Sequence, residues 1–169
     1  LLKEIKNLDL KNIFFLNKKE LDNLITSNSL IEKFKVIKKY PSTLNVKIEQ
    51  TNFLAEINHG EKNYIIGSNG KLISNKFNNQ KLPFIFGKPD IIEFLEFKDI
   101  IDKSNIPYEK IENFYFFPSK RWDLKFNNNI LLKLPKNVTK KLLNDAYVFL
   151  ESYNISKSNV IDVRVNNQI

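Results

Sequence analysis

The sequence predicts an α+β protein: a small helix-and-hairpin unit, followed by a mainly antiparallel β domain with two covering helices. Apolar and polar residues alternate with period two over most of the expected strands. The connections between these strands are short and hold turn-forming pairs such as Asn69-Gly70. Two segments, near 91–104 and 138–153, space their apolar residues as helices that cover one face of a sheet.

Composition describes a folded chain. Its 169 residues are 42% apolar and 12% aromatic, which is enough apolar surface to offset the loss of chain entropy on folding. The densest apolar runs, residues 13–16 and 114–117, are far shorter than the roughly 18 residues of a membrane-crossing helix. The sequence itself therefore predicts no membrane span.

The N-terminal unit is expected over residues 1–50. Asn17 and Glu20 have capping-box spacing and start a helix over 18–26, and apolar positions within residues 1–8 indicate the end of another helix. A strand over 34–40, a turn at 41–43 and the alternating strand 44–48 then predict a β-hairpin packed on the helix.

The β domain is expected from Thr51 onward. Asp90 and Glu93 form a second capping box ahead of the helix near 91–104, and Asn137 is expected to cap the helix near 138–153. The predicted strands are 53–57, 64–66, 72–73, 82–86, 114–117, 122–126, 130–134 and 160–165.

The residues needed for catalysis are scarce. The chain has no Cys and one His, His59, which excludes thiol chemistry, disulfides and multi-histidine metal sites. The turn at 67–70 lacks the Lys-Ser/Thr and the helix of a phosphate loop. The carboxylate pairs Glu93/Glu96 and Asp99/Asp102 fit a solvated helix face better than an acid–base pair. The sequence predicts no enzyme, no metal and no cofactor.

The two arginines, Arg121 and Arg164, stand out because the other 25 of the 27 basic residues are Lys. A guanidinium forms forked, planar hydrogen bonds that an ammonium does not. Period-two alternation places Asp162 and Arg164 together on one face of the last strand. Two readings stay open at this point: an Asp–Arg ladder on the outer face of a sheet, or a partner-binding position.

Six segments follow one another in a recognisable order and spacing. They are Lys39-Tyr40-Pro41 with the strand that follows, Leu54-Ala55, residues 64–70, Leu82-Pro83-Phe84-Ile85-Phe86-Gly87, Arg121-Trp122-Asp123-Leu124 with Leu134-Pro135, and Ile161-Asp162-Val163-Arg164-Val165. Together they resemble the FtsQ/DivIB family of cell division proteins, whose members have a POTRA domain and a β domain outside the cytoplasmic membrane. The Trp-Asp-Leu form is similar to that of alphaproteobacterial members. Gln50-Thr51-Asn52-Phe53 departs from the Glu-Arg-x-Pro of the family, so we expect different packing at the domain junction.

The resemblance implies an incomplete POTRA domain over 1–50, without its first strand, and an FtsQ-type β domain over 51–169. It implies a non-enzymatic divisome scaffold on the periplasmic side of the inner membrane at the septum, with a transmembrane helix upstream of Leu1 and a last strand that continues past Ile169. FtsB is expected to add a strand beside the last strands, FtsL to join through FtsB, and nucleic acid not to bind. The partner-binding positions carried over are Lys120, Arg121, Arg164, Val165 and Asn167.

Two other classes of function stay open. Lys33, Lys35, Lys38 and Lys39 are the centre of a basic module for nucleic acid or an anionic membrane surface, whose binding would weaken steeply with salt. A hydrolase would need two carboxylates that converge in one pocket, which a sequence does not display.

Overall fold

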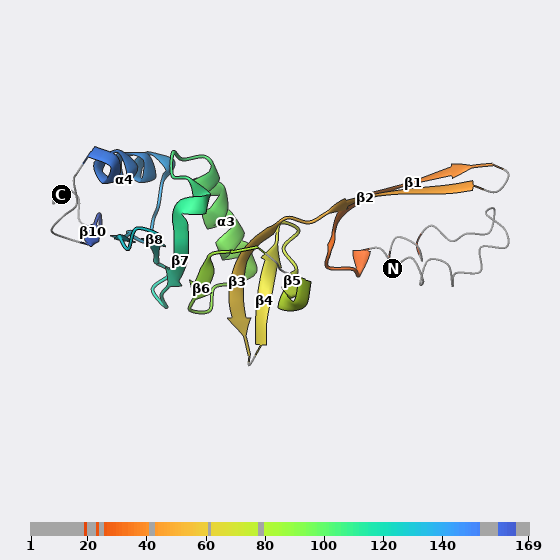
Figure 1. Ribbon diagram of the computed structural model, residues 1–169, viewed down its shortest axis with the longest axis horizontal. Coiled ribbons are helices and arrows are strands. Elements are labelled where there is room, and N and C mark those ends of the chain that lie inside the picture. The colour runs from red at the N-terminus through yellow and green to blue at the C-terminus, as the bar shows by residue number, and fades with distance from the viewer. Residues whose placement is uncertain are drawn as a thin grey trace.

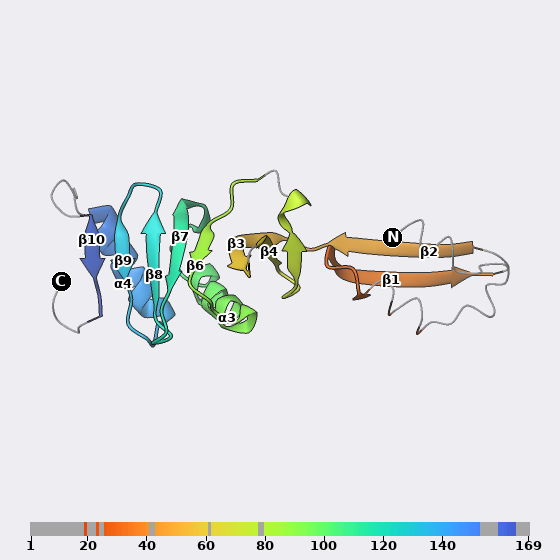
Figure 2. The same ribbon diagram turned by 90° about the horizontal axis from the view of Figure 1, so that it is seen from below.

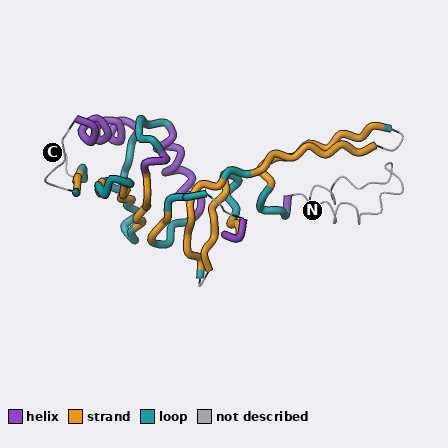
Figure 3. Tube along the Cα trace, viewed as in Figure 1, coloured by secondary structure: helices purple, strands orange, loops and turns teal. Residues whose placement is uncertain are grey.

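The computed structural model describes residues 19, 23, 26–40, 43–60, 62–77, 80–152 and 159–164. Two N-terminal predictions lie mainly outside these residues: the helix over 18–26 and the helix end within 1–8. The predicted packing of the hairpin on a helix lies outside them as well. From residue 26 onward the secondary structure follows the predicted order, and Figure 3 shows helices, strands and loops along the trace.

The N-terminal hairpin is present as predicted. β1 (Ile31–Lys39) and β2 (Thr43–Gln50) pair antiparallel with Val36 opposite Val46, and they extend away from the rest of the molecule (Figure 1). Phe34 and Ile48 lie opposite each other on the same face as the valines, and Lys38 also falls on this face, opposite Leu44. The other four lysines of the two strands share the opposite face. The period-two pattern of the sequence therefore separates a mainly apolar face from one that carries most of the lysines.

The second unit is an eight-stranded sheet in the order β10-β9-β8-β7-β6-β3-β4-β5. Figure 2 shows β10 to β6 side by side. The strands are β3 (Phe53–His59), β4 (Lys62–Gly67), β5 (Leu72–Ser74), β6 (Phe84–Phe86), β7 (Ile111–Phe116), β8 (Trp122–Phe126), β9 (Leu131–Lys133) and β10 (Val160–Asp162). Two single-turn 3₁₀ helices, η1 (Asn75–Phe77) and η2 (Tyr108–Lys110), were not predicted.

Antiparallel pairs predominate, which confirms the predicted α+β class, but the sheet is mixed. β6 is inserted between β3 and β7 and runs parallel to both, and β10 runs parallel to β9. A parallel neighbour requires a long crossover connection, and the helices supply it between β6 and β7 and between β9 and β10. Strand periodicity carries no information about such partners, so the parallel pairings emerge only from the tertiary structure.

Two helices cover one face of this sheet, as predicted (Figure 1). α3 (Ile91–Asp102) begins at the expected box, where the Asp90 N–H donates to Glu93 Oε2 at 3.2 Å. α4 (Lys140–Ser152) is not capped by Asn137, and that prediction is wrong. Thr139 directly precedes the helix, and its Oγ1 accepts the N–H of Leu142 at 3.2 Å.

Aromatic side chains fill the space between α3 and the sheet. Phe97 stacks on Trp122 of β8 at 4.9 Å between ring centroids, and Phe94 meets Phe114 of β7 edge to face at 5.6 Å. Phe94 and Phe114 are fully buried. The same cluster continues under α4 through Leu143, so one apolar core holds both helices and the central strands together.

Polar contacts join the hairpin to the sheet. The turn after β4 donates from Ser68 Oγ to Glu32 Oε2 at 2.7 Å and from Asn69 Nδ2 to the carbonyl oxygen of Ile31 at 2.9 Å. Thr51 is buried within this junction, and its Oγ1 lies 3.0 Å from Ser68 Oγ. The segment 50–53, which departs from the family pattern, thus contributes a hydroxyl to a shared hydrogen-bond network.

Candidate functional site

The end of the sheet nearest the C-terminus is the candidate partner-binding site. β10 pairs with β9 through Val160 opposite Leu131 and Asp162 opposite Lys133. No other strand of the described residues pairs with β10. The outer edge of a terminal strand presents backbone N–H and C=O groups to which a further strand can bind.

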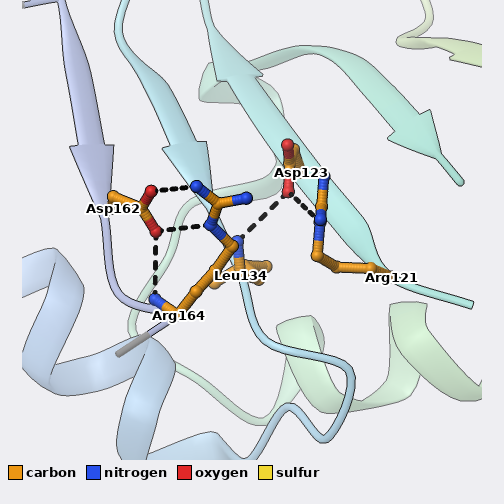
Figure 4. A network of polar contacts seen from close by, with 5 residues as sticks. All are labelled: Arg121, Asp123, Leu134, Asp162 and Arg164. Carbon is orange, nitrogen blue, oxygen red and sulfur yellow. Dashed lines mark hydrogen bonds and ion pairs between the residues drawn. The ribbon is translucent and has the colours of Figure 1, made fainter. Parts of the chain in front are cut away.

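Asp162 and Arg164 form a forked ion pair at this edge (Figure 4). Arg164 Nε donates to Asp162 Oδ1 at 2.7 Å, Nη2 donates to Oδ2, and the Arg164 backbone N–H donates to Oδ1 at 3.1 Å. These hydrogen bonds lower the pKa of Asp162 to about 2. Both side chains stay more than a third exposed, at 38% for Asp162 and 37% for Arg164. The pairing, one of the two readings that the sequence left open, is therefore present, and both side chains are accessible.

Asp123 forms a second pair beside the first (Figure 4). Its Oδ1 accepts the N–H of Leu134 at 3.2 Å and lies 3.3 Å from Arg121 Nε. Arg121 also stacks over the ring of Phe117 at 4.2 Å. Asp123 is only 3% exposed, although strand alternation predicts an outward, solvated position. The one sequence signal for this burial is Arg121 two residues earlier on the same face of the strand.

Arg121, Asp123 and Arg164 line one hollow on the face of the sheet opposite the helices. The hydrogen bonds to Asp162 raise the pKa of Arg164, and the negative charge of Asp123 acts in the same direction. Four basic side chains line the hollow: Arg121, Lys125, Lys133 and Arg164. Three of them are paired with carboxylates, Arg121 with Asp123, Arg164 with Asp162 and Lys125 with Glu112. Such a surface is suited to an extended segment with acidic side chains, since charge-assisted hydrogen bonds to guanidinium are the stronger ones.

Lys120 lies elsewhere. It occupies the β7–β8 turn with φ 60°, and its Nζ lies 2.7 Å from Oε1 of Glu93 on α3. This contact lowers the pKa of Glu93. Lys120 lines a hollow beside α3, whereas Arg121 and Arg164 line the one on the opposite face. The structure thus brings the two arginines together but not Lys120, and Val165 and Asn167 lie outside the described residues.

The alternative catalytic candidates have other contacts. Asp99 and Asp102 pair with Lys103 and Lys98 on the surface of α3, as the solvated reading predicts. His59 is exposed and touches only the edge of Tyr64 among the ring contacts of the described residues, at 6.3 Å. Within the described ranges, no group of three or more His, Cys, Asp or Glu side chains is placed to hold a metal ion. No helix among these residues has the length and hydropathy of a bilayer span.

Comparison with known families decides the relationship. Residues 55–164 match the family model described as cell division protein FtsQ/DivIB, C-terminal. The chain belongs to the FtsQ/DivIB family. Residues 1–50 match the POTRA domain of FtsQ type, which agrees with the N-terminal resemblance. FtsQ/DivIB proteins are non-enzymatic division proteins, in line with the prediction of no catalysis.

A curated relative and a solved structure are also similar. The cell division protein FtsQ of Rhizobium meliloti (strain 1021) is 27% identical over 121 residues, which cover 69% of this chain and 38% of that protein. The chain thus matches well under half of the relative's length. The major extracytoplasmic domain of DivIB from Geobacillus stearothermophilus is 14% identical with a TM-score of 0.42, and the match covers 63% of this chain and 90% of that one.

Proposed function

We propose that this chain is the extracytoplasmic part of an FtsQ-like scaffold of the division machinery. It has a POTRA domain over 1–50 and a β domain over 51–169, and a transmembrane helix upstream of Leu1 anchors it in the inner membrane. It acts on the periplasmic side at the septum. Membership of the family supports this assignment, as does a relative whose length greatly exceeds the matched part.

The partner is an FtsB-like protein that adds a strand to the outer edge of β10, and an FtsL-like protein joins through it. The observation that carries this proposal is that β10, the terminal strand of the sheet among the described strands, lies beside a hollow lined by basic side chains. Backbone hydrogen bonds along β10 would contribute affinity, while the side chains of the hollow would select the acidic segment of the partner.

Arg164 has hydrogen-bonding capacity left for a partner. Its Nε and Nη2 bind Asp162, which occupies one edge of the guanidinium, and a guanidinium has five N–H donors in all. Nη1 is therefore available to a partner carboxylate without breaking the pair with Asp162. The pair holds the side chain in place before binding, which reduces the entropy lost in the complex.

The test compares Arg164→Ala with the unchanged chain for binding to a peptide from the FtsB homologue of the same organism. Charge-assisted hydrogen bonds contribute about 1.5–3 kcal/mol each, so we expect affinity to fall about ten- to a hundredfold. Arg164→Lys should also bind more weakly, because an ammonium does not reproduce the fork. Lys103→Ala removes a surface ion pair on α3 and serves as the matched control with unchanged affinity.

Thermal unfolding of the same variants separates binding from folding. The exposed Asp162–Arg164 pair contributes at most about 1 kcal/mol, so the stability of Arg164→Ala should stay near that of the unchanged chain. Unchanged affinity together with a large loss of stability would make Arg164 a structural ladder residue, and the binding patch would then lie elsewhere. Lys120→Ala, measured in parallel, tests whether the hollow beside α3 contributes to the same partner.

A further inference from the structure

The β1–β2 hairpin has one face that consists largely of lysine. Strand alternation and the register place Lys33, Lys35 and Lys39 of β1 on the same face as Lys47 of β2. All four side chains are exposed. None of the four ammonium groups makes a hydrogen bond or an ion pair within the part of the chain that the structure describes, and Glu49, although it lies opposite Lys33, forms no ion pair with it.

The arrangement is unfavourable for the hairpin itself. Lys35 lies directly opposite Lys47, and like charges in directly opposed positions destabilise an antiparallel pair. The pairing runs without a shift from Lys33 opposite Glu49 to Lys39 opposite Thr43, so Lys35 and Lys47 are held opposite each other. An anion on this face would relieve it, so the free hairpin favours binding of a negatively charged surface.

We infer that this lysine face binds the anionic phospholipid headgroups of a membrane. An ammonium is a mobile point charge suited to a fluid layer of phosphates, whereas arginine suits fixed bidentate contacts, and the hairpin contains no arginine. Tyr40 follows Lys39 at the end of β1 and is 63% exposed, and tyrosine is enriched at the headgroup level. The choice of a membrane over nucleic acid rests on the extracytoplasmic location proposed above.

The experiment measures sedimentation of the chain with vesicles of phosphatidylcholine alone and with vesicles that also contain phosphatidylglycerol. We expect binding only to the second kind, weakening as salt rises. Each lysine near an anionic leaflet is worth roughly a fivefold gain in partitioning. Changing all four to Gln (Lys33, Lys35, Lys39 and Lys47) should therefore lower the affinity at least about a hundredfold.

Two variants serve as controls. Four exposed lysines of the eight-stranded unit, Lys76, Lys81, Lys88 and Lys136, changed to Gln remove the same charge and should leave vesicle binding largely intact. Arginine at the four hairpin positions keeps the charge and should keep vesicle binding. Thermal unfolding of each variant verifies the fold, and removal of the opposed charges should not destabilise the hairpin.

Three outcomes would overturn the inference. The first is that the unchanged chain does not bind the anionic vesicles. The second is that both Gln variants lose the same affinity for these vesicles, and the third is that the four hairpin lysines bind duplex DNA more tightly than the vesicles. Binding of the FtsB-derived peptide is measured on the same variants and should be unchanged in all of them. If the chain binds the anionic vesicles but not the peptide, the proposed partner is wrong and the inference about the lysine face still holds.

Discussion

Replacement of Gly87 by alanine is expected to destabilise the eight-stranded sheet strongly. Gly87 follows β6 directly and has φ +103°, a conformation that side-chain-bearing residues rarely adopt. A Cβ at this position would lie 2.3 Å from the carbonyl oxygen of Phe116, at the end of β7. The obstacle is backbone within a paired strand, so a side-chain rotation does not remove it.

The expected cost is the sum of two effects. A left-handed conformation costs an L-residue about 1–2 kcal/mol. Forcing an extra carbon into a packed site costs about 1–3 kcal/mol more, and here it would push β6 away from β7 next to the pair Phe86 and Tyr115. We expect a loss of about 3 kcal/mol, which for a chain of this size lowers Tm by roughly 6–12 °C.

Gly60→Ala is the matched control. Gly60 also has positive φ, +66°, but a Cβ there meets no atom within 4 Å. Its replacement should cost only the conformational part, about 1–2 kcal/mol. Urea unfolding followed by circular dichroism compares the two variants. Equal losses of stability would contradict the close approach of Gly87 to Phe116 and the reasoning built on it.

Two further predictions concern carboxylates of the eight-stranded sheet. Asp123→Ala leaves the buried N–H of Leu134 without its acceptor and should cost about 1–3 kcal/mol in urea unfolding, whereas Glu112→Ala, at an exposed ion pair, should cost less than about 1 kcal/mol. The pKa of Asp162 is lowered to about 2 by Arg164, so its small stabilising contribution is present above pH 3.8 and is lost as pH falls through 2. An NMR titration should find a midpoint near 2 that rises toward 3.8 in Arg164→Ala, and an unshifted midpoint in the unchanged chain would contradict the pair.

Local features were predicted well. The Asn69-Gly70 turn and the start of α3 at Asp90 are confirmed, and Asp162 and Arg164 lie together as the alternation predicts. Each depends on residues within four positions of one another, where backbone preference and side-chain spacing act directly. The family was also recognisable, because its short motifs occur in order along the chain and the family model matches residues 55–164.

The contacts between distant segments were not predictable in the same way. Asp123 alternates with the apolar residues of β8 and is nevertheless buried, because it pairs with Arg121 and accepts the N–H of Leu134 in the segment after β9. Lys120 was grouped with Arg164, but the β7–β8 turn directs it to Glu93 on α3. Its role in partner binding stays a prediction, with a position now known.

The sequence by itself determined which residues form strands, which faces are apolar and where turns and most helix ends fall, because these follow from periods and propensities within a few residues. The tertiary structure alone decided that β6 lies between β3 and β7 and that β10 pairs in parallel with β9. It also decided that Arg121, Asp123 and Arg164 line one hollow. Strand partners and the burial of a charge depend on which distant segments the helical crossovers bring together, and no local pattern encodes that.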